Sequence, residues 1–284
     1  MKLNQFYVDN LIKEAISEDI NYIDVSADYL IPEEQRNDSY FVSKADGVLC
    51  GLDIAMRVFT LLDDTFTYTV HKNDGDEVKA GDLIVEFNGK TACLLKGERT
   101  ALNLIQHMSG IATLTNECVK QIEGTEATIA DTRKTLPGLR SLQKYAVTCG
   151  GGKNHRYNLS DGAMLKDNHI DAGGGITNAV AILRSKLGHM VKIEVETRNF
   201  DEVKEAVENN YIHIHDKDYY LTKSFTCLQH PLDRIFESGF RIGHGEARAP
   251  KRIETAAMLA VISLESVQNE MHGGQAIPAF DFYM

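Results

Sequence analysis

Residues whose types could support catalysis follow three short apolar runs in the second half of the chain. The runs cover 127–131, 162–166 and 192–196, and each reads as a buried β-strand. The polar residues at or after their ends are Asp131-Thr-Arg-Lys134, Lys166-Asp-Asn-His169, and the pair Glu194 and Glu196. In a sheet built from βα units the carboxyl ends of the strands meet at one edge, so we expect a single site there.

The window from 131 to 169 is basic although the chain as a whole is acidic. It holds seven Lys and Arg against three acids, whereas the formal net charge of the protein is -11. Gly150-Gly-Gly152 would let backbone N–H groups approach an anion, and His155 and Arg156 follow directly. This pattern favours a small polyanionic ligand over nucleic acid or an anionic membrane. The alternative interpretation is a solvated basic face.

Apolar spacing predicts the elements that must hold these residues in place. Helices are expected near 4–17, 52–62, 139–149 and 176–187, with a long one over 98–122 that Ser109-Gly110 interrupts. Strands are expected at 39–44, 66–70 and 83–87, with a hairpin turn at Asn88-Gly89. The first 100 residues therefore read as an antiparallel α/β sandwich, and the later βα alternation predicts a parallel sheet.

A second reading of the N-terminal part is a carrier domain. The segment 74–82 resembles the turn of lipoyl and biotinyl domains, which need a lysine at an exposed hairpin tip, and Lys90 would be that lysine. We prefer two glycine turns between strands.

Longer strings in the chain resemble the quinolinate phosphoribosyltransferase family over residues 1 to about 209. They are GERTALNLIQHMSGIAT (97–113), DTRKTLPGLR (131–140), KYAV (144–147), GGGKNHR (150–156) and LKDNH (165–169). The resemblance implies an α/β fold: an N-terminal α/β sandwich (1–109), the first part of an α/β barrel with the catalytic motifs (110–210), and an atypical C-terminal segment (211–284). It also implies a homodimer.

The reaction implied by this resemblance is Mg²⁺-dependent phosphoribosyl transfer in NAD synthesis. Quinolinate and phosphoribosyl pyrophosphate would give nicotinate mononucleotide, pyrophosphate and CO₂. Arg99 would enter the site of the partner subunit, and Lys134 would lie beside the reacting centre. The other residues that the resemblance places at the substrates are Thr132, Arg133, His155, Arg156, Lys166 and Glu196, with Lys134, Lys166 and Glu196 as the catalytic set and Glu196 at the metal.

The resemblance ends near Asn209-Asn210, and residues 211–284 instead resemble an internal segment of anaerobic ribonucleoside-triphosphate reductase. The matching strings are YIHIHDKDYY (211–220), FTCLQH (225–230), GFRIGHG (239–245) and QNEMHGGQ (268–275). The chain therefore reads as a fusion of two unrelated pieces. Reductase activity is not expected, because the rest of that family's barrel and its glycyl-radical segment are missing.

Asp216 is the candidate second metal ligand. The family's aspartate would fall at Lys217 by count from Glu196, so Asp216 reaches the site only if the turn at 209–210 is one residue shorter. The run 211–216 reads as a strand and 256–271 as a helix. His213, His215, Cys227 and His230 could also pass as a zinc pattern, but the reductase resemblance accounts for them without a metal.

Two functional hypotheses remain after these observations. The first is an active phosphoribosyltransferase. The second is a fusion that folds and binds quinolinate but transfers phosphoribose poorly, because the later phosphate-binding turns have no substitute. Five scattered cysteines and no apolar run of about 18 residues favour a reducing, cytoplasmic setting over secretion or a membrane.

Overall fold

The structure is a computed structural model that describes residues 2–125, 128–197, 199–208 and 280–283. It divides into two compact units. The first unit holds the described residues up to Glu117 together with 135–152 and 280–283, and the second holds 118–134 and 153–208 with the same gaps. No helix in the described ranges is long and apolar enough to span a membrane.

The first unit is built around a sheet with the strand order β3-β5-β1-β8. Neighbouring strands pair antiparallel, with Phe41 of β1 opposite Val85 of β5, and Tyr68 of β3 opposite Phe87. The bounds of these strands are β1 Arg36–Ser43, β3 Thr67–Val70, β5 Leu83–Lys90 and β8 Phe280–Tyr283. A separate pair joins β2 (Gly47–Val48) to β4 (Glu77–Val78).

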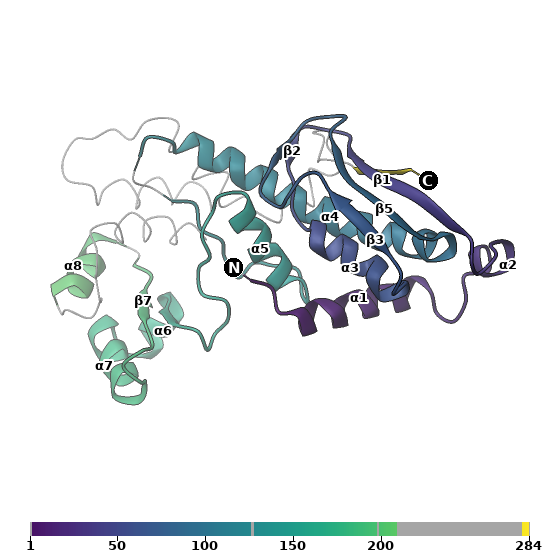
Figure 1. The fold of residues 1–284 in the computed structure, drawn as a ribbon. Helices are drawn as coiled ribbons and strands as arrows, with labels where there is room; N and C mark the ends of the chain where they lie inside the picture. Colours follow the sequence, from purple (N-terminus) through teal and green to yellow (C-terminus); the bar gives the residue numbers. More distant parts are fainter. Residues whose placement is uncertain (1, 126–127, 198, 209–279, 284) are drawn as a thin grey trace. The chain divides into compact units, whose positions relative to one another are not determined.

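Five helices of the described residues belong wholly or mostly to this unit. They are α1 Gln5–Asp19, α2 Ala27–Leu30, α3 Leu52–Leu62, most of α4 Thr91–Gln121, and α5 Arg140–Cys149. Helices α3 and α4 lie against the sheet (Figure 1), where Phe41, Phe59 and Phe87 form one buried aromatic group with ring centroids 5.2–6.3 Å apart. The expected α/β sandwich is therefore confirmed.

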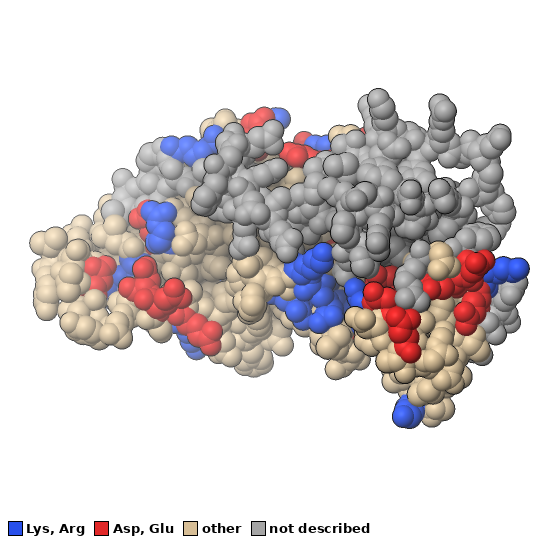
Figure 2. Space-filling view, turned by 180° about the vertical axis from the view of Figure 1, so that it is seen from behind, with Lys and Arg blue, Asp and Glu red and all other residues tan. Residues whose placement is uncertain are grey.

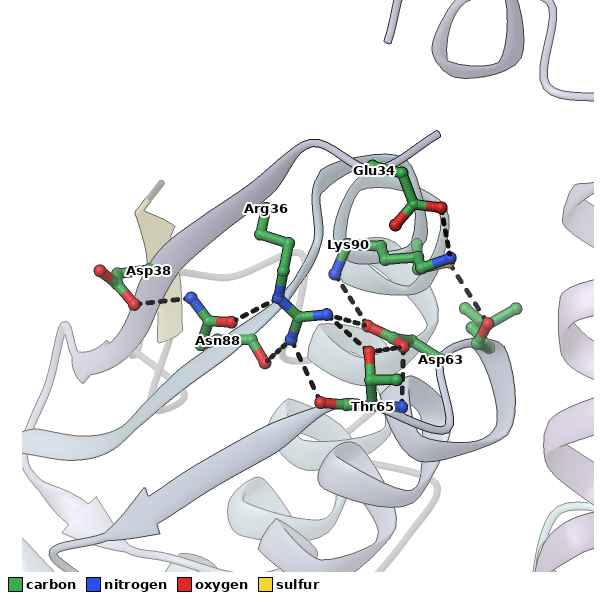
Figure 3. A network of polar contacts seen from close by, with 9 residues as sticks. Glu34, Arg36, Asp38, Asp63, Thr65, Asn88 and Lys90 are labelled. Atoms are coloured by element: carbon green, nitrogen blue, oxygen red, sulfur yellow. Dashed lines mark hydrogen bonds and ion pairs between the residues drawn. The ribbon is translucent and has the colours of Figure 1, made fainter. Parts of the chain in front are cut away.

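The edge of the sheet is held to the end of α3 by a polar network (Figure 3). Arg36 donates from Nε to Asn88 Oδ1 at 2.8 Å and from Nη1 to Thr65 Oγ1, and Asp63 Oδ2 accepts from the Lys90 backbone N–H at 2.8 Å. Burial alone would raise the pKa of Asp63, but hydrogen bonds from Thr65 and Lys90 and the nearby Arg36 charge lower it. The Asp63 carboxylate is therefore ionised at neutral pH and connects the end of α3 to β1 and β5.

Two sequence-based expectations fail at this junction. Asn88-Gly89 is not a turn: both residues lie inside β5, paired with Asp38 and Asn37. A Cβ on Gly89 would stand 3.0 Å from both Leu94 and Phe66, so close packing is what requires a glycine there. Lys90 is half-buried with its Nζ 3.8 Å from Glu34, so it is not at an exposed hairpin tip as a carrier lysine would be.

The long helix also differs from its expected form. Helix α4 begins at Thr91, seven residues earlier than expected, and runs through Ser109-Gly110 without a break. The Ser109 hydroxyl accepts from Cys50 N at 2.9 Å and donates to Cys50 O at 3.1 Å. A serine that could interrupt a helix is therefore used to attach α4 to the loop before α3.

The second unit contains a parallel pair, β6 (Ala163–Leu165) with β7 (Ile193–Val195). Its helices are α6 Asp167–Ala172, α7 Ile176–Lys186 and α8 Phe200–Glu208. Leu165, Ile193 and Val195 are buried in one core with residues of α6 and α7. Of the expected strand at 127–131, the described residues 128–131 form one parallel bridge, from Ala130 to Lys153.

The predicted boundaries of the three domains stay predictions. Residues 211–216, 256–271 and the zinc-like set His213, His215, Cys227 and His230 lie outside the described residues, and so does Asp216.

Candidate active site

Five basic side chains of the second unit line one pocket of about 180 Å³. They come from two loops and the end of one strand, and Met164 supplies the apolar part of the wall. The lining residues are Arg133, Lys134, His155, Arg156, Met164 and Lys166. The pocket therefore concentrates four permanent positive charges and one imidazole.

The strand pair β6–β7 explains why Lys166 and two carboxylates belong to the same surface. Leu165 and Val195 point into the core, and they are partners across the sheet. Side chains alternate along a strand, so Met164 and Lys166 face the other way, together with Glu194 and Glu196. This alternation is the signal that could have identified Met164 from the sequence.

Each of these carboxylates is paired with a cation of the pocket. Glu194 Oε2 lies 2.7 Å from His155 Nε2, and Glu196 Oε2 lies 3.3 Å from Lys166 Nζ. The backbone N–H of Glu196 donates to Leu165 O at 2.8 Å, which fixes the carboxylate just beyond the end of β7. Strand alternation in the sequence puts Glu194 on the same face as Glu196 but assigns no role to Glu194. In the structure the Glu194 carboxylate contacts the imidazole of His155.

The loop that carries His155 and Arg156 is held by a buried acid. Asp131 accepts from the His155 backbone N–H at 2.8 Å and from Asn154 Nδ2 at 2.6 Å, while its own backbone N–H donates to Lys153 O. The two loops that line the pocket are therefore joined by hydrogen bonds to one carboxylate.

Arg156 is a pocket cation with hydrogen-bonding capacity left over. Its Nη1 donates to Gly162 O at 2.8 Å. Its Nε is buried and has no hydrogen-bond partner within the described part of the chain. A buried guanidinium N–H is costly to leave without an acceptor, so this group is suited to an anionic ligand.

The three glycines before this loop do a different job from the expected one. The N–H groups of Gly150, Gly151 and Gly152 donate to carbonyls of Ala146, Thr148 and Val147 at the end of α5. A Cβ on Gly150 would lie 2.3 Å from Ala112 O. The glycines therefore end α5 and allow it to approach α4. The expectation that their backbone N–H groups bind an anion is wrong.

The remaining site residues of the sequence analysis lie apart from the pocket lining. Thr132 Oγ1 accepts from Lys134 N at 3.0 Å and shapes the turn that presents Lys134. Arg99 is exposed on α4 in the first unit. The roles of these residues, and those of the pocket residues, stay predictions.

Both signs of charge are present on the molecular surface. In the view of Figure 2, Lys and Arg atoms and Asp and Glu atoms form separate small groups. On the described residues of this face the basic groups stay small, and the formal net charge of the protein is -11.

Comparison with known families matches the chain to three family descriptions. Residues 24–109 match the N-terminal domain of quinolinate phosphoribosyl transferase, and residues 111–218 match its C-terminal domain. Residues 177–284 match anaerobic ribonucleoside-triphosphate reductase. Both resemblances seen in the sequence are therefore confirmed.

Curated relatives match the first two thirds of the chain. A probable carboxylating nicotinate-nucleotide pyrophosphorylase of Bacillus subtilis is 44% identical over 205 residues, which cover 72% of this chain and 71% of the relative. A protein of the same description from Synechocystis is 44% identical over 200 residues, covering 70% and 68%. In both cases the match leaves out more than a quarter of the relative.

Solved structures share the fold. NadC from Streptococcus pyogenes has a TM-score of 0.76 at 29% identity and covers 100% of this chain and 98% of its own. The nicotinate-nucleotide pyrophosphorylase of Francisella tularensis has a TM-score of 0.75 at 29% identity, with coverages of 99% and 97%.

Proposed function

Because the chain belongs to the quinolinate phosphoribosyltransferase family, we propose that it transfers ribose 5-phosphate from phosphoribosyl pyrophosphate to quinolinate, with loss of CO₂. The products are nicotinate mononucleotide, pyrophosphate and CO₂, and the reaction belongs to NAD biosynthesis. The observation that carries this proposal is the pocket lined by five basic side chains in one unit.

The pocket suits a ligand with two carboxylates on a flat ring. Arg133 and Arg156 carry planar guanidinium groups, each of which can donate two parallel hydrogen bonds to one carboxylate. Lys134 and Lys166 add positive charge around them. Met164 supplies an apolar wall for the ring face. Without substrate, Glu196 forms an ion pair with Lys166. When quinolinate binds, one of its carboxylates would pair with Lys166 in place of Glu196.

His155 adds a fifth donor whose direction is set by the protein. Glu194 accepts from or shares a proton with Nε2, which turns the other ring nitrogen away from that carboxylate. The backbone of the same residue is fixed by Asp131. The imidazole is thus oriented before the substrate arrives, which lowers the cost of binding.

Bond making needs positioning more than covalent help. The ring nitrogen of quinolinate forms the bond to the anomeric carbon as the bond to pyrophosphate breaks. Both reactants are anions, and fixed cations bring them together and stabilise the charge that leaves. The carbon–carboxylate bond then breaks, its electron pair remains on the ring carbon, and a proton replaces the lost CO₂. Lys134, which lines the pocket, would stabilise the electron pair on that carbon with its charge.

Magnesium is the cofactor we propose, with Glu196 as the ligand from this chain and Asp216 as a second one. Mg²⁺ binds one or two protein carboxylates and completes its shell with water and substrate phosphate oxygens. Glu196 fits this chemistry because it presents a carboxylate beside the pocket. When bound, Mg²⁺ would neutralise the pyrophosphate group as it departs.

The assembly we propose is a cytoplasmic homodimer in which Arg99 of one subunit serves the site of the other. Arg99 is exposed on α4, as a residue at a subunit interface would be in the isolated chain.

Substrate discrimination tests the proposal. Pyrophosphate release with Mg²⁺ and phosphoribosyl pyrophosphate should require quinolinate and should fall to background with nicotinate or nicotinamide. Those analogues lack one or both carboxylates and leave the pocket cations without partners. Equal release with nicotinate would contradict the assignment of the pocket.

A second candidate is the impaired fusion, which binds quinolinate and transfers poorly. It is favoured by the overlap of the two family matches between 177 and 218, together with the unmatched quarter of the relatives. Quinolinate binding without pyrophosphate release would support it.

A further inference from the structure

Four side chains of the first unit that the proposed reaction does not use lie together around α3 and α5. Cys50 precedes α3, Asp74 lies between β3 and β4, and Tyr145 and Cys149 are one turn apart on α5. One potential ligand atom from each of Cys50, Asp74 and Cys149 lies within 4.8 Å of the other two. Cys50 is fully buried and the others are half-buried.

Asp74 is a partly buried carboxylate whose hydrogen bonds come from neutral donors. It accepts from Gly51 N at 2.9 Å on both oxygens, from Leu52 N at 3.0 Å and from the Tyr145 hydroxyl at 3.0 Å. None of these donors carries a positive charge to balance the carboxylate. Within the described residues no Lys, Arg or His pairs with it, and burial raises its pKa in spite of the hydrogen bonds.

Two thiols lie beside Asp74, and both are free cysteines. Deprotonated together, the two sulfurs and the carboxylate would place three negative groups close to one another, and buried charges need partners. A cation bound by all three would be such a partner.

We propose that Cys50, Cys149 and Asp74 bind one thiophilic divalent cation of the zinc class. Zn–S and Zn–O bonds of about 2.3 and 2.1 Å place tetrahedral donors about 3.5–3.8 Å apart, so the three donor atoms need only a small contraction. Two thiolates select such a cation over Mg²⁺, which prefers oxygen ligands. Tyr145 orients the carboxylate through its hydroxyl, as an outer partner of the site.

The site would join the start of α3 to the end of α5. Cys149 is the last residue of α5 and precedes the glycines that lead to His155. A cation that binds only the folded chain would raise its free energy of unfolding, by an amount that grows with the logarithm of the cation concentration above Kd. This role is separate from the proposed phosphoribosyl transfer, so either can fail without the other.

Cobalt(II) added to the reduced full-length protein is the direct probe. We expect one Co²⁺ per chain with a sulfur-to-metal charge-transfer band, displaced by Zn²⁺ and unaffected by excess Mg²⁺. Cys149→Ser and Cys50→Ser should each weaken Co²⁺ binding by at least about 100-fold, more than loss of an outer partner. Tyr145→Phe should weaken it by only about tenfold.

Matched controls are the other cysteines. Cys93→Ser and Cys118→Ser should leave the band unchanged. Cys227→Ser should as well, although Cys227 belongs to the zinc-like set of the sequence. Thermal unfolding gives a second readout: Zn²⁺ should raise the unfolding temperature of the wild type and of Cys227→Ser, but not that of Cys149→Ser.

Three results would overturn the proposal. One is the absence of the band in the reduced protein. Another is a band lost in Cys227→Ser and kept in Cys149→Ser. The third is a non-reduced protein lighter by two hydrogen atoms with a Cys50–Cys149 peptide, which would identify a disulfide instead.

Discussion

At the scale of single residues, the function depends on a charge balance that changes when the substrate binds. Glu194 and Glu196 occupy His155 and Lys166 in the free protein, while Arg156 retains a buried N–H without an acceptor in the described part. The two acids reduce the repulsion among the pocket cations, and the dianionic substrate then neutralises the positive charge that remains. Loss of any one cation should therefore affect substrate binding more than folding.

Lys134→Ala and Lys166→Ala should each weaken quinolinate binding at least tenfold, or lower turnover to a similar extent. Each change removes one charge from the pocket, and a charge-assisted hydrogen bond contributes about 1.5–3 kcal/mol. Calorimetry with quinolinate measures the effect.

Lys186→Ala is the matched control, because it removes one exposed lysine of α7 in the same unit outside the pocket lining. If both pocket variants bound and turned over quinolinate as the control does, the basic residues would be a solvated face and the assignment would be wrong.

The pocket residues could be predicted from the sequence because of their positions after strands. Lys166 and Glu196 directly follow the short apolar runs that form β6 and β7, and Arg133 and Lys134 follow the run that forms the bridge at Ala130. The basic window as a whole was less informative: Lys144 counts toward its charge but is buried in the first unit. Charge counting cannot separate a buried lysine from a pocket lysine, whereas strand alternation can.

At the scale of elements, α5 and the glycines after it connect the core to the loop of His155. The helix ends where Gly150 packs against α4, and the N–H groups of Gly150, Gly151 and Gly152 donate to carbonyls of its last turn. Sequence reasoning assigned these glycines to anion binding because a glycine needed for packing looks the same as one needed for a ligand. The same ambiguity explains the failed turn at Asn88-Gly89.

Gly150→Ala should destabilise the protein by at least about 1–3 kcal/mol, since the new methyl group would clash with Ala112 O and Thr115. Urea unfolding measures the free energy. Gly188→Ala is the control, because nothing lies within 4 Å of its Cβ position and its φ is ordinary. Equal stabilities of the two variants would show that α5 does not pack on α4 as described.

The pairing of α1 with α3 should make stability depend on acid pH. Arg57 donates from Nε and Nη2 to the two oxygens of Asp9, both at 2.8 Å, and lowers the pKa of Asp9 to about 2. A lowered folded-state pKa contributes stability above the ordinary value of 3.8, and this contribution is lost as the pH falls toward 2.

Arg57→Ala should therefore cost up to about 1 kcal/mol at pH 6, a modest amount because both side chains are partly exposed. The difference from wild type should shrink as the pH falls below about 4. Urea unfolding at several pH values checks this, with Lys186→Ala, which removes an exposed lysine of α7, as the control. A difference that stayed constant down to pH 3 would contradict the ion pair.

At the scale of the whole molecule, the chain joins a family domain pair to a segment that matches a different family. The described residues contain the sandwich, the β6–β7 pair and the basic pocket. The fold class could be predicted from the periodicity of apolar residues. Strand β8 at 280–283 could not, because its four residues are recognisable as a strand only through their pairing with β1.

The proposed dimer predicts complementation between two inactive variants. Arg99→Ala and Lys166→Ala should each be nearly inactive alone. Co-expressed in equal amounts, they should recover about one quarter of wild-type activity, because half of the dimers carry one intact site. Pyrophosphate release by the purified mixture is the measurement, and separately expressed variants assayed without subunit exchange are the control. Absence of any recovery in verified heterodimers would place Arg99 outside the partner's site.

The most direct test of the proposed function is release of CO₂ from quinolinate labelled in the carboxyl group next to the ring nitrogen. With phosphoribosyl pyrophosphate and Mg²⁺, the account predicts labelled CO₂ and nicotinate mononucleotide in equal amounts, both dependent on each substrate and both abolished in Lys166→Ala. Quinolinate that binds in the pocket and yields no labelled CO₂ would contradict the account and identify the chain as the impaired fusion.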